Sequence, residues 1–195
     1  MGKVGTGFSM SLDGFIAGPG DDVQRLFKWY FSGDTEIKFP GGMVVRVSPA
    51  SGELILELFE TIGALVTGRR QFDNTNGWGG RHPLEVPVFV VTHTVPQELV
   101  KEGSPFTFVT DGVESAIEQA KAVAGDKNVA VDGANIVQQC IKAGLVDEIG
   151  IDLVPVLLGK GIRLFDHLGT EQIELESTRV IEVPGVTHLR FRVVK

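Results

Sequence analysis

Three segments of the chain place residues suited to phosphate or ring binding at the ends of predicted strands. In the first, an apolar run over 129–131 stops at Asp132 and Gly133, and an amphipathic helical pattern follows. A helix beginning there turns unpaired N–H groups and its positive dipole end toward the turn, where a phosphate can bind. Glycine at such a turn also lets a ligand approach the backbone closely.

The other two segments are residues 67–70 and 88–93. Arg69 and Arg70 lie at a strand-to-helix junction, where two guanidinium groups suit the 2′-phosphate of NADPH. The same pair also fits a solvated basic surface. Thr92 and His93 end the next predicted strand, and ligands of parallel sheets lie at the carboxyl ends of strands. They are therefore candidate ribose or adenine contacts, although a lone His93 equally fits a surface position.

Other kinds of site are disfavoured by spacing. Gly5 and Gly7 lie inside a strand pattern and lack the third glycine of a dinucleotide fingerprint. The four histidines show no metal-ligand spacing, so no metal site is predicted. The single cysteine, Cys140, forms no internal disulfide, fits a reducing compartment and is expected in the core.

Composition limits the partners and the class of protein. The chain has 195 residues, enough for one sizeable core, and a net charge of -7. This charge argues against a broad surface for nucleic acid or anionic membranes, and no apolar run is long enough to span a bilayer. The start of the chain leads directly into a strand pattern without a signal-peptide signature, so a cytoplasmic protein is expected.

Periodicity predicts strands that alternate with helices through the middle of the chain and a closing pair of strands. We expect strands over 3–12, 64–67, 86–92, 106–109, 129–131 and from residue 149. We expect helices over 21–31, 48–62, from 68, over 111–124 and after Gly133. Residues 173–183 and 186–194 read as an antiparallel hairpin, and 32–47 as an irregular insert. The pattern predicts one α/β domain over 1–195 with a mixed, mostly parallel sheet.

Four blocks resemble the dihydrofolate reductase superfamily, in particular the reductase domain of bacterial riboflavin biosynthesis and its stand-alone relatives. The blocks are S-L-D-G-F-I-A at 11–17, T-G-R-R at 67–70, V-F-V-V-T-H at 88–93 and the stretch 131–165. Within the last block, A-G-L-V-D-E at 143–148 and P-V-L-L-G at 155–159 are especially characteristic. The resemblance implies a three-layer, single-domain dihydrofolate-reductase-like fold, NADPH as cofactor and a homodimer.

The resemblance also implies which residues bind NADPH across the ends of the central strands. They are Ala17 near the nicotinamide, Gly68, Arg69, Arg70 and Gln71 at the phosphates, Thr92 and His93 near the adenosine, and Asp132, Gly133, Ala134, Asn135 and Ile136 at the pyrophosphate turn. Many relatives have glycine where this chain has Asp132. Because aspartate is a favoured helix cap, we predict that Asp132 caps the helix that follows.

Substrate contacts and acids are less sharply indicated. Trp29 and Trp78 are candidates to stack on a heterocycle. In folate reductases an acid on the helix before the Gly-Arg segment anchors the substrate, which makes Glu53 and Glu57 candidates, although a solvated acidic face explains them equally. Asp13 is a further candidate acid in an Asp-Gly turn signal.

The resulting prediction is an NADPH-dependent reductase that transfers hydride to a small pteridine or pyrimidine-linked substrate. Two substrates remain open: dihydrofolate, and the 5-amino-6-(5-phosphoribosylamino)uracil of riboflavin biosynthesis. The alternative is a non-catalytic, cofactor-binding or dimeric relative that keeps the fold without turnover. A bound cofactor would supply the redox chemistry, and the protein would orient the reactants.

Overall fold

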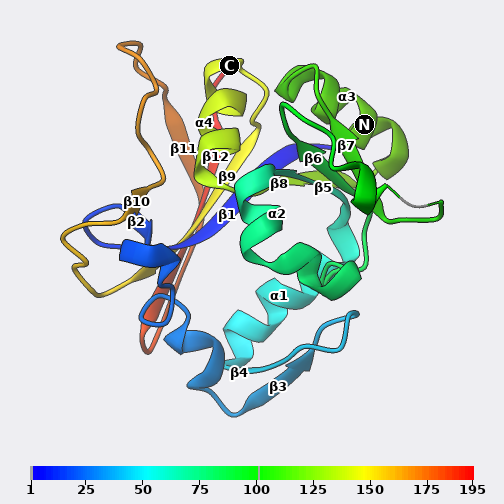
Figure 1. Ribbon diagram of the computed structural model, residues 1–195. Helices are drawn as coiled ribbons and strands as arrows, with labels where there is room; N and C mark the ends of the chain where they lie inside the picture. The colour runs from blue at the N-terminus through cyan, green and yellow to red at the C-terminus, as the bar shows by residue number, and fades with distance from the viewer. Residues whose placement is uncertain (1, 101) are drawn as a thin grey trace.

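A mixed sheet forms the centre of the molecule, seen in Figure 1 from β11 to β7. The structure, a computed structural model, describes residues 2–100 and 102–195. Within these residues the sheet has eight strands in the order β11-β12-β9-β1-β8-β5-β6-β7. All neighbours from β9 to β7 run parallel, whereas β12 and β11 are antiparallel to their neighbours. The predicted mixed sheet with a C-terminal antiparallel hairpin is confirmed.

The sheet strands follow the apolar runs of the sequence closely. Their bounds are β1 (Val4–Ser11), β5 (Ile62–Gly68), β6 (Val88–Val91), β7 (Phe106–Val109), β8 (Asn128–Val131), β9 (Glu148–Val154), β11 (Leu175–Val183) and β12 (Val186–Val193). In β5, Ala64 and Val66 pack on one face, while Leu65 packs on the other. Strands buried on both faces read as continuous apolar runs, which is why these runs were recognisable.

Helices cover both faces of the sheet and make it the middle of three layers. On one face, α3 (Val113–Ala124) and α4 (Ala134–Lys142) pack on the side chains that include Ala64 and Val66. On the other face lie α1 (Pro49–Thr61) and α2 (Arg69–Asn74). Ser48 is the N-cap of α1: its side chain accepts a hydrogen bond from Ser51 N at 3.2 Å, as the Ser-Pro sequence predicts. None of the described helices is long and apolar enough to cross a membrane.

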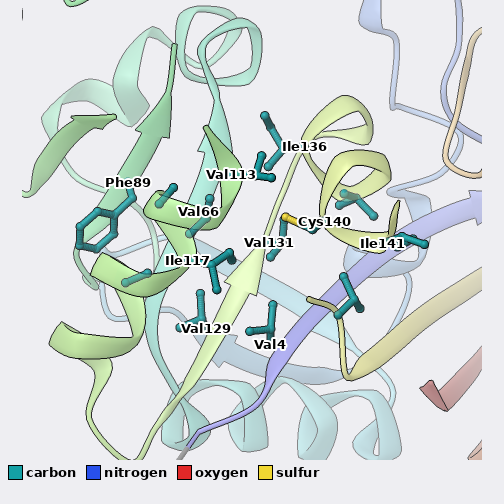
Figure 2. Close-up of a cluster of buried hydrophobic side chains, with 14 of the residues drawn as sticks. Val4, Val66, Phe89, Val113, Ile117, Val129, Val131, Ile136, Cys140 and Ile141 are labelled. Atoms are coloured by element: carbon teal, nitrogen blue, oxygen red, sulfur yellow. The ribbon is translucent and has the colours of Figure 1, made fainter. Parts of the chain in front are cut away.

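The largest core lies between the sheet and α3 and α4. Figure 2 shows side chains from β1, β5 and β8 meeting those of the two helices, with Cys140 among them. Cys140 is fully buried, and burial raises the pKa of its thiol to about 12. It is a core residue, as predicted.

Two short pairs of strands stand apart from the main sheet. β2 (Phe15–Ala17) pairs with β10 (Ile162–Arg163), and β3 (Thr35–Lys38) pairs with β4 (Val44–Val47), both antiparallel. The expectation of an irregular insert over 32–47 was therefore wrong. Alternation buries Ile37, Val45 and Val47 against α1, so the hairpin has a core face of its own.

The helix expected over 21–31 is also absent as such. The described chain there forms two single-turn 3-10 segments, η1 (Pro19–Asp21) and η2 (Lys28–Phe31). Gly20 and Asp21 have positive φ values of 71° and 61°, which a continuous α-helix does not permit. Two more short 3-10 segments, η3 (Asn76–Gly80) and η4 (Gln97–Leu99), follow α2 and β6.

Candidate functional site

A deep cleft opens at the carboxyl ends of the parallel strands. Its volume is about 1380 Å³, and residues from β1, β2, β9 and the loops after β5, β6 and β8 line it. All the residues predicted to bind the cofactor lie on its wall: Ala17, Gly68, Arg69, Arg70, Gln71, Thr92, His93, Asp132, Gly133, Ala134, Asn135 and Ile136. Segments far apart in the sequence are thus brought to one edge of the sheet, where parallel α/β folds bind ligands.

The turn from β8 into α4 presents a helix N-terminus to this cleft. Gly133 is the N-cap residue, with φ 86° and ψ 122°, a backbone conformation open to glycine but strained for other residues. The residues of the first helical turn, Ala134 to Ile136, face the cleft and include no acid. Because the first N–H groups of a helix have no intrahelical partners, they can bind an anion here.

Asp132 does not cap α4, contrary to the prediction. Its Oδ1 accepts a hydrogen bond from Gly133 N at 2.8 Å, one residue before the helix, and its carboxyl also interacts with the Gln71 side chain. Gly133, with a positive φ, is itself the N-cap residue, and α4 has no side-chain cap hydrogen bond. Burial raises the pKa of Asp132, against the lowering effect of the two hydrogen bonds. A carboxyl shifted toward its neutral form is more compatible with a neighbouring phosphate.

Thr67 begins the predicted phosphate-binding segment 67–70, was not one of the predicted cofactor contacts, and lies beside the same turn. Its Oγ1 is the one buried side-chain polar atom in the described part of the chain without a hydrogen-bond partner. A Cβ built on Gly133 would lie 4.0 Å from this oxygen. An unsatisfied buried hydroxyl costs about 1–3 kcal/mol, so such groups call for a partner. The signal in the sequence was a hydroxyl residue at the end of an otherwise apolar strand.

The two arginines already have carboxylate partners. Arg69 Nε donates to Asp73 Oδ1 at 2.7 Å, and Arg70 Nη2 donates to Asp21 at 3.0 and 3.1 Å. Arg70 and Asp21 both line the cleft, and their pair links α2 to the loop after β2. Exposed pairs of this kind contribute little stability, so an arriving phosphate can replace the carboxylate at small cost.

At the end of β6, Thr92 is buried and His93 is exposed at the cleft wall. Thr92 Oγ1 donates to Thr94 O at 3.0 Å and accepts from Thr94 N at 3.3 Å, so it fixes the turn after the strand. His93 is therefore the more accessible of the two to a ligand.

The other half of the cleft has apolar and aromatic walls. Phe8, Ile16, Phe27, Tyr30 and Ile162 line it. The hydroxyl residue Ser9 and the acid Asp152 line the cleft with them. A pocket with mostly apolar walls and few polar groups is typical of a site for a small planar molecule.

Neither predicted stacking tryptophan lies at the cleft. Trp29 is 6% exposed, donates from Nε1 to Ser9 Oγ at 2.9 Å and stacks on Tyr30 with ring centroids 3.9 Å apart. The residue that reaches the cleft is its neighbour Tyr30, because the 3-10 turn directs the two rings differently. Trp78 packs edge-on against Phe72 and His82, beside the core formed by α2, β5 and β6.

The predicted acids also lie away from the cleft wall. Asp13 accepts hydrogen bonds from Ser11 Oγ at 2.6 Å and from the backbone N–H groups of Leu158 and Gly159, so it fastens two loops together. The Ser11 hydroxyl is the largest influence that lowers the pKa of Asp13 to about 2. Glu53 is exposed on α1, and Glu57 pairs with Arg179 of β11 at 2.8 Å. The acid that does reach the aromatic half of the cleft, Asp152, was missed.

Comparison with known proteins decides the family. The model of the RibD C-terminal domain matches residues 3–189. The chain belongs to this family. The uncharacterized protein YwjB of Bacillus subtilis is 23% identical over 172 residues, 88% of this chain and 87% of YwjB. Its structural neighbours include reductases of riboflavin biosynthesis and a dihydrofolate reductase.

Solved structures support the same fold. A Shewanella sp. PV-4 protein, provisionally assigned to riboflavin biosynthesis, is 24% identical with a TM-score of 0.76, and 100% of each chain is covered. Dihydrofolate reductase from Enterococcus faecalis, solved with NADP(H) and RAB-propyl, is 15% identical with a TM-score of 0.59, over 99% of this chain and 97% of that one. The three-layer dihydrofolate-reductase-like fold expected from the sequence is confirmed.

No group of three or more metal-ligating side chains occurs within residues 2–100 and 102–195.

Proposed function

We propose that this RibD-type chain is an NADPH-dependent reductase. The observation that carries the proposal is the cleft itself, whose wall brings together the N-terminus of α4 and two arginines at the start of α2. These groups are complementary to the phosphates of a dinucleotide. NADPH, when bound, supplies the hydride, and the chain supplies binding and orientation.

Each part of the cofactor has a matching set of groups on the cleft wall. The N–H groups from Ala134 to Ile136, in the first turn of α4, face a pyrophosphate. Arg69 and Arg70 bind the 2′-phosphate, with Arg70 exchanging its Asp21 partner. Thr92 and His93 border the adenosine, and Ala17 borders the nicotinamide.

The substrate occupies the aromatic half of the cleft. A planar pteridine or pyrimidine ring suits walls made by Phe8, Phe27 and Tyr30. We favour the pyrimidine-linked substrate of riboflavin biosynthesis because the family model that matches is that of the RibD C-terminal domain. Dihydrofolate is the second candidate, since the fold is shared with dihydrofolate reductase.

Titration with NADPH, followed by intrinsic tryptophan fluorescence, tests the proposal. We expect saturable binding in the micromolar range typical of enzyme–ligand pairs, about 1–100 μM. The double variant Arg69→Ala, Arg70→Ala should weaken NADPH about tenfold or more while changing NADH little, because a charge-assisted contact is worth roughly 1.5–3 kcal/mol. Arg81→Ala, which removes an exposed arginine paired with Glu85 away from the cleft, is the matched control.

Two results would count against the proposal. No binding at millimolar NADPH removes the cofactor assignment altogether, and equal losses for NADPH and NADH remove the 2′-phosphate role of the arginines. Binding without oxidation of NADPH by dihydrofolate or by 5-amino-6-(5-phosphoribosylamino)uracil favours the non-catalytic alternative instead.

A further inference from the structure

A chain of buried polar side chains runs from the start of α1 to the aromatic half of the cleft. His188 of β12 is 1% exposed, with Nε2 2.8 Å from Ser51 Oγ and Nδ1 2.7 Å from Asp152 Oδ1. Ser48 Oγ donates to Ser51 Oγ at 2.9 Å, and the Trp29 ring packs edge-on against the imidazole at 5.1 Å. Cofactor binding as proposed above uses none of these groups.

The hydrogen-bonded order serine, histidine, aspartate matches that of a hydrolytic triad. In a hydrolytic triad the serine meets the substrate, whereas here the aspartate is the residue that reaches the cleft. Ser51 is 1% exposed and does not line the cleft, so its hydroxyl cannot attack a substrate. Asp152 does line the cleft, and its side chain is 13% exposed. The end of the chain that meets a ligand is therefore the carboxylate.

Hydrogen-bond directions fix how this carboxylate is held. Because Ser51 Oγ accepts from Ser48, its own hydrogen is free for His188 Nε2, which leaves Nδ1–H to donate to Asp152 Oδ1. Arg190 Nη1 donates to the same oxygen at 3.0 Å. Oδ1 thus receives two donors, whereas Oδ2 has no hydrogen-bond partner among the residues that the structure describes.

The surroundings of Oδ2 define what it can bind. Asp152 lines the same cleft as the rings of Phe8, Phe27 and Tyr30, so a flat molecule fits beside it. Arg163 also lines the cleft, but its guanidinium lies over the Phe15 ring at 4.4 Å and donates to Asp13 O. A carboxylate oxygen accepts hydrogen bonds and has none to donate, so the complementary ligand carries N–H donors.

We propose that Asp152 recognises the substrate, with Oδ2 accepting a hydrogen bond from an N–H group of a flat, neutral or cationic ring. His188, Ser51 and Arg190 are positioning residues that hold the carboxylate through its other oxygen. The inference rests on the proposed function in taking this half of the cleft as the substrate half. It adds the residue that selects the substrate and the chemistry by which it selects.

Benzamidine and benzoate are a matched pair of probes, because both are flat and of similar size while one donates N–H bonds and the other is an anion. Ligand-observed NMR should show benzamidine binding with a Kd of about 1 mM, as expected for so small a ligand, and benzoate at least about tenfold weaker. Asp152→Asn should weaken benzamidine about tenfold or more, because the charge-assisted bond is lost. Glu118→Gln changes an exposed carboxylate of α3 away from the cleft and should leave benzamidine binding unchanged.

The positioning role has its own test. His188→Asn keeps an N–H donor near Nδ1 and should retain most benzamidine affinity, whereas His188→Leu removes the donor and should lose about fivefold or more. Rescue by the asparagine distinguishes orientation of Asp152 from simple filling of the core. Equal losses in the two variants would assign His188 a packing role alone.

Several outcomes overturn the assignment of Asp152: no benzamidine binding, equal binding of benzoate, or no loss in Asp152→Asn. Should that variant not fold, the wild-type protein decides, because benzamidine must shift the His188 ring resonances and benzoate must not. NADPH affinity measured on the same samples separates the two proposals. If NADPH binds normally but benzamidine binding does not depend on Asp152, only this inference is wrong. If benzamidine binding depends on Asp152 but NADPH does not bind, only the proposed cofactor is wrong.

Discussion

A partly buried acid lies beneath the turn that we assign to the pyrophosphate. Asp132 stands where many relatives have glycine, and its hydrogen bonds run to Gly133 and Gln71 rather than into α4. Burial raises the pKa of this carboxyl, so the folded protein binds its proton more tightly than the unfolded chain. The ionised form therefore costs folding free energy wherever the pH exceeds the raised pKa.

Because the raised pKa of Asp132 makes its ionised form destabilising, we predict that Asp132→Asn stabilises the fold at neutral pH. The variant should unfold a few degrees higher than the wild type at neutral pH, since a shift of about 1 kcal/mol moves Tm by roughly 2–4 °C at this size. The advantage should shrink as the pH falls through the raised pKa and vanish below the ordinary carboxyl range. Thermal unfolding followed by circular dichroism across pH measures it, with Asp166→Asn as an exposed control. A constant advantage at all pH values would contradict the account.

At the scale of elements, the β8–α4 turn depends on a backbone conformation at Gly133 that favours glycine. A Cβ at position 133 would meet nothing closer than 3.8 Å, so the obstacle to alanine is the φ of 86° rather than a clash. Gly133→Ala should cost about 1–3 kcal/mol and also weaken NADPH, because relief of the strain moves the helix N-terminus.

Gly144→Ala is the matched control for this variant. Gly144 also has a positive φ, of 68°, with open space around its would-be Cβ, but it lies after α4 and away from the cleft. It should lower Tm without changing NADPH affinity. Urea unfolding measures the loss of stability, and NADPH titration measures the loss of affinity. An unchanged NADPH affinity in Gly133→Ala would show that the turn does not contact the cofactor.

The sequence predicted those elements whose signal is local. Apolar runs located the buried strands, and the three cleft-lining turns were found because each follows such a run. The hairpin β3–β4 was missed because glycine and proline obscure its alternation. Asp152 and His188 lie 36 residues apart, and only the antiparallel register of β9 and β12 places them opposite each other. No periodicity reports such a pairing, nor which of Trp29 and Tyr30 faces the cleft.

At the scale of the whole molecule, the sheet edge formed by β11 is long and exposed to solvent. β11 is an edge strand of nine residues, and most of its side chains are exposed, including Val180 at 61% and Leu175 at 43%. A long edge strand offers unpaired backbone groups to a second chain. We therefore place the expected homodimer contact at β11, where two copies can pair about a two-fold axis.

Light scattering coupled to size exclusion tests this assignment. We expect a mass near twice the 21.0 kDa of the chain. Val180→Lys places a charge on the exposed face of β11 and should shift the protein to monomers, because like charges then oppose each other across the axis. Val123→Lys, at a similarly exposed position on α3, is the control and should leave the dimer intact. A monomeric wild type, or a dimer that tolerates Val180→Lys, would exclude β11 as the interface. If Val180→Lys is a monomer, its NADPH affinity shows whether each cleft is complete within one chain.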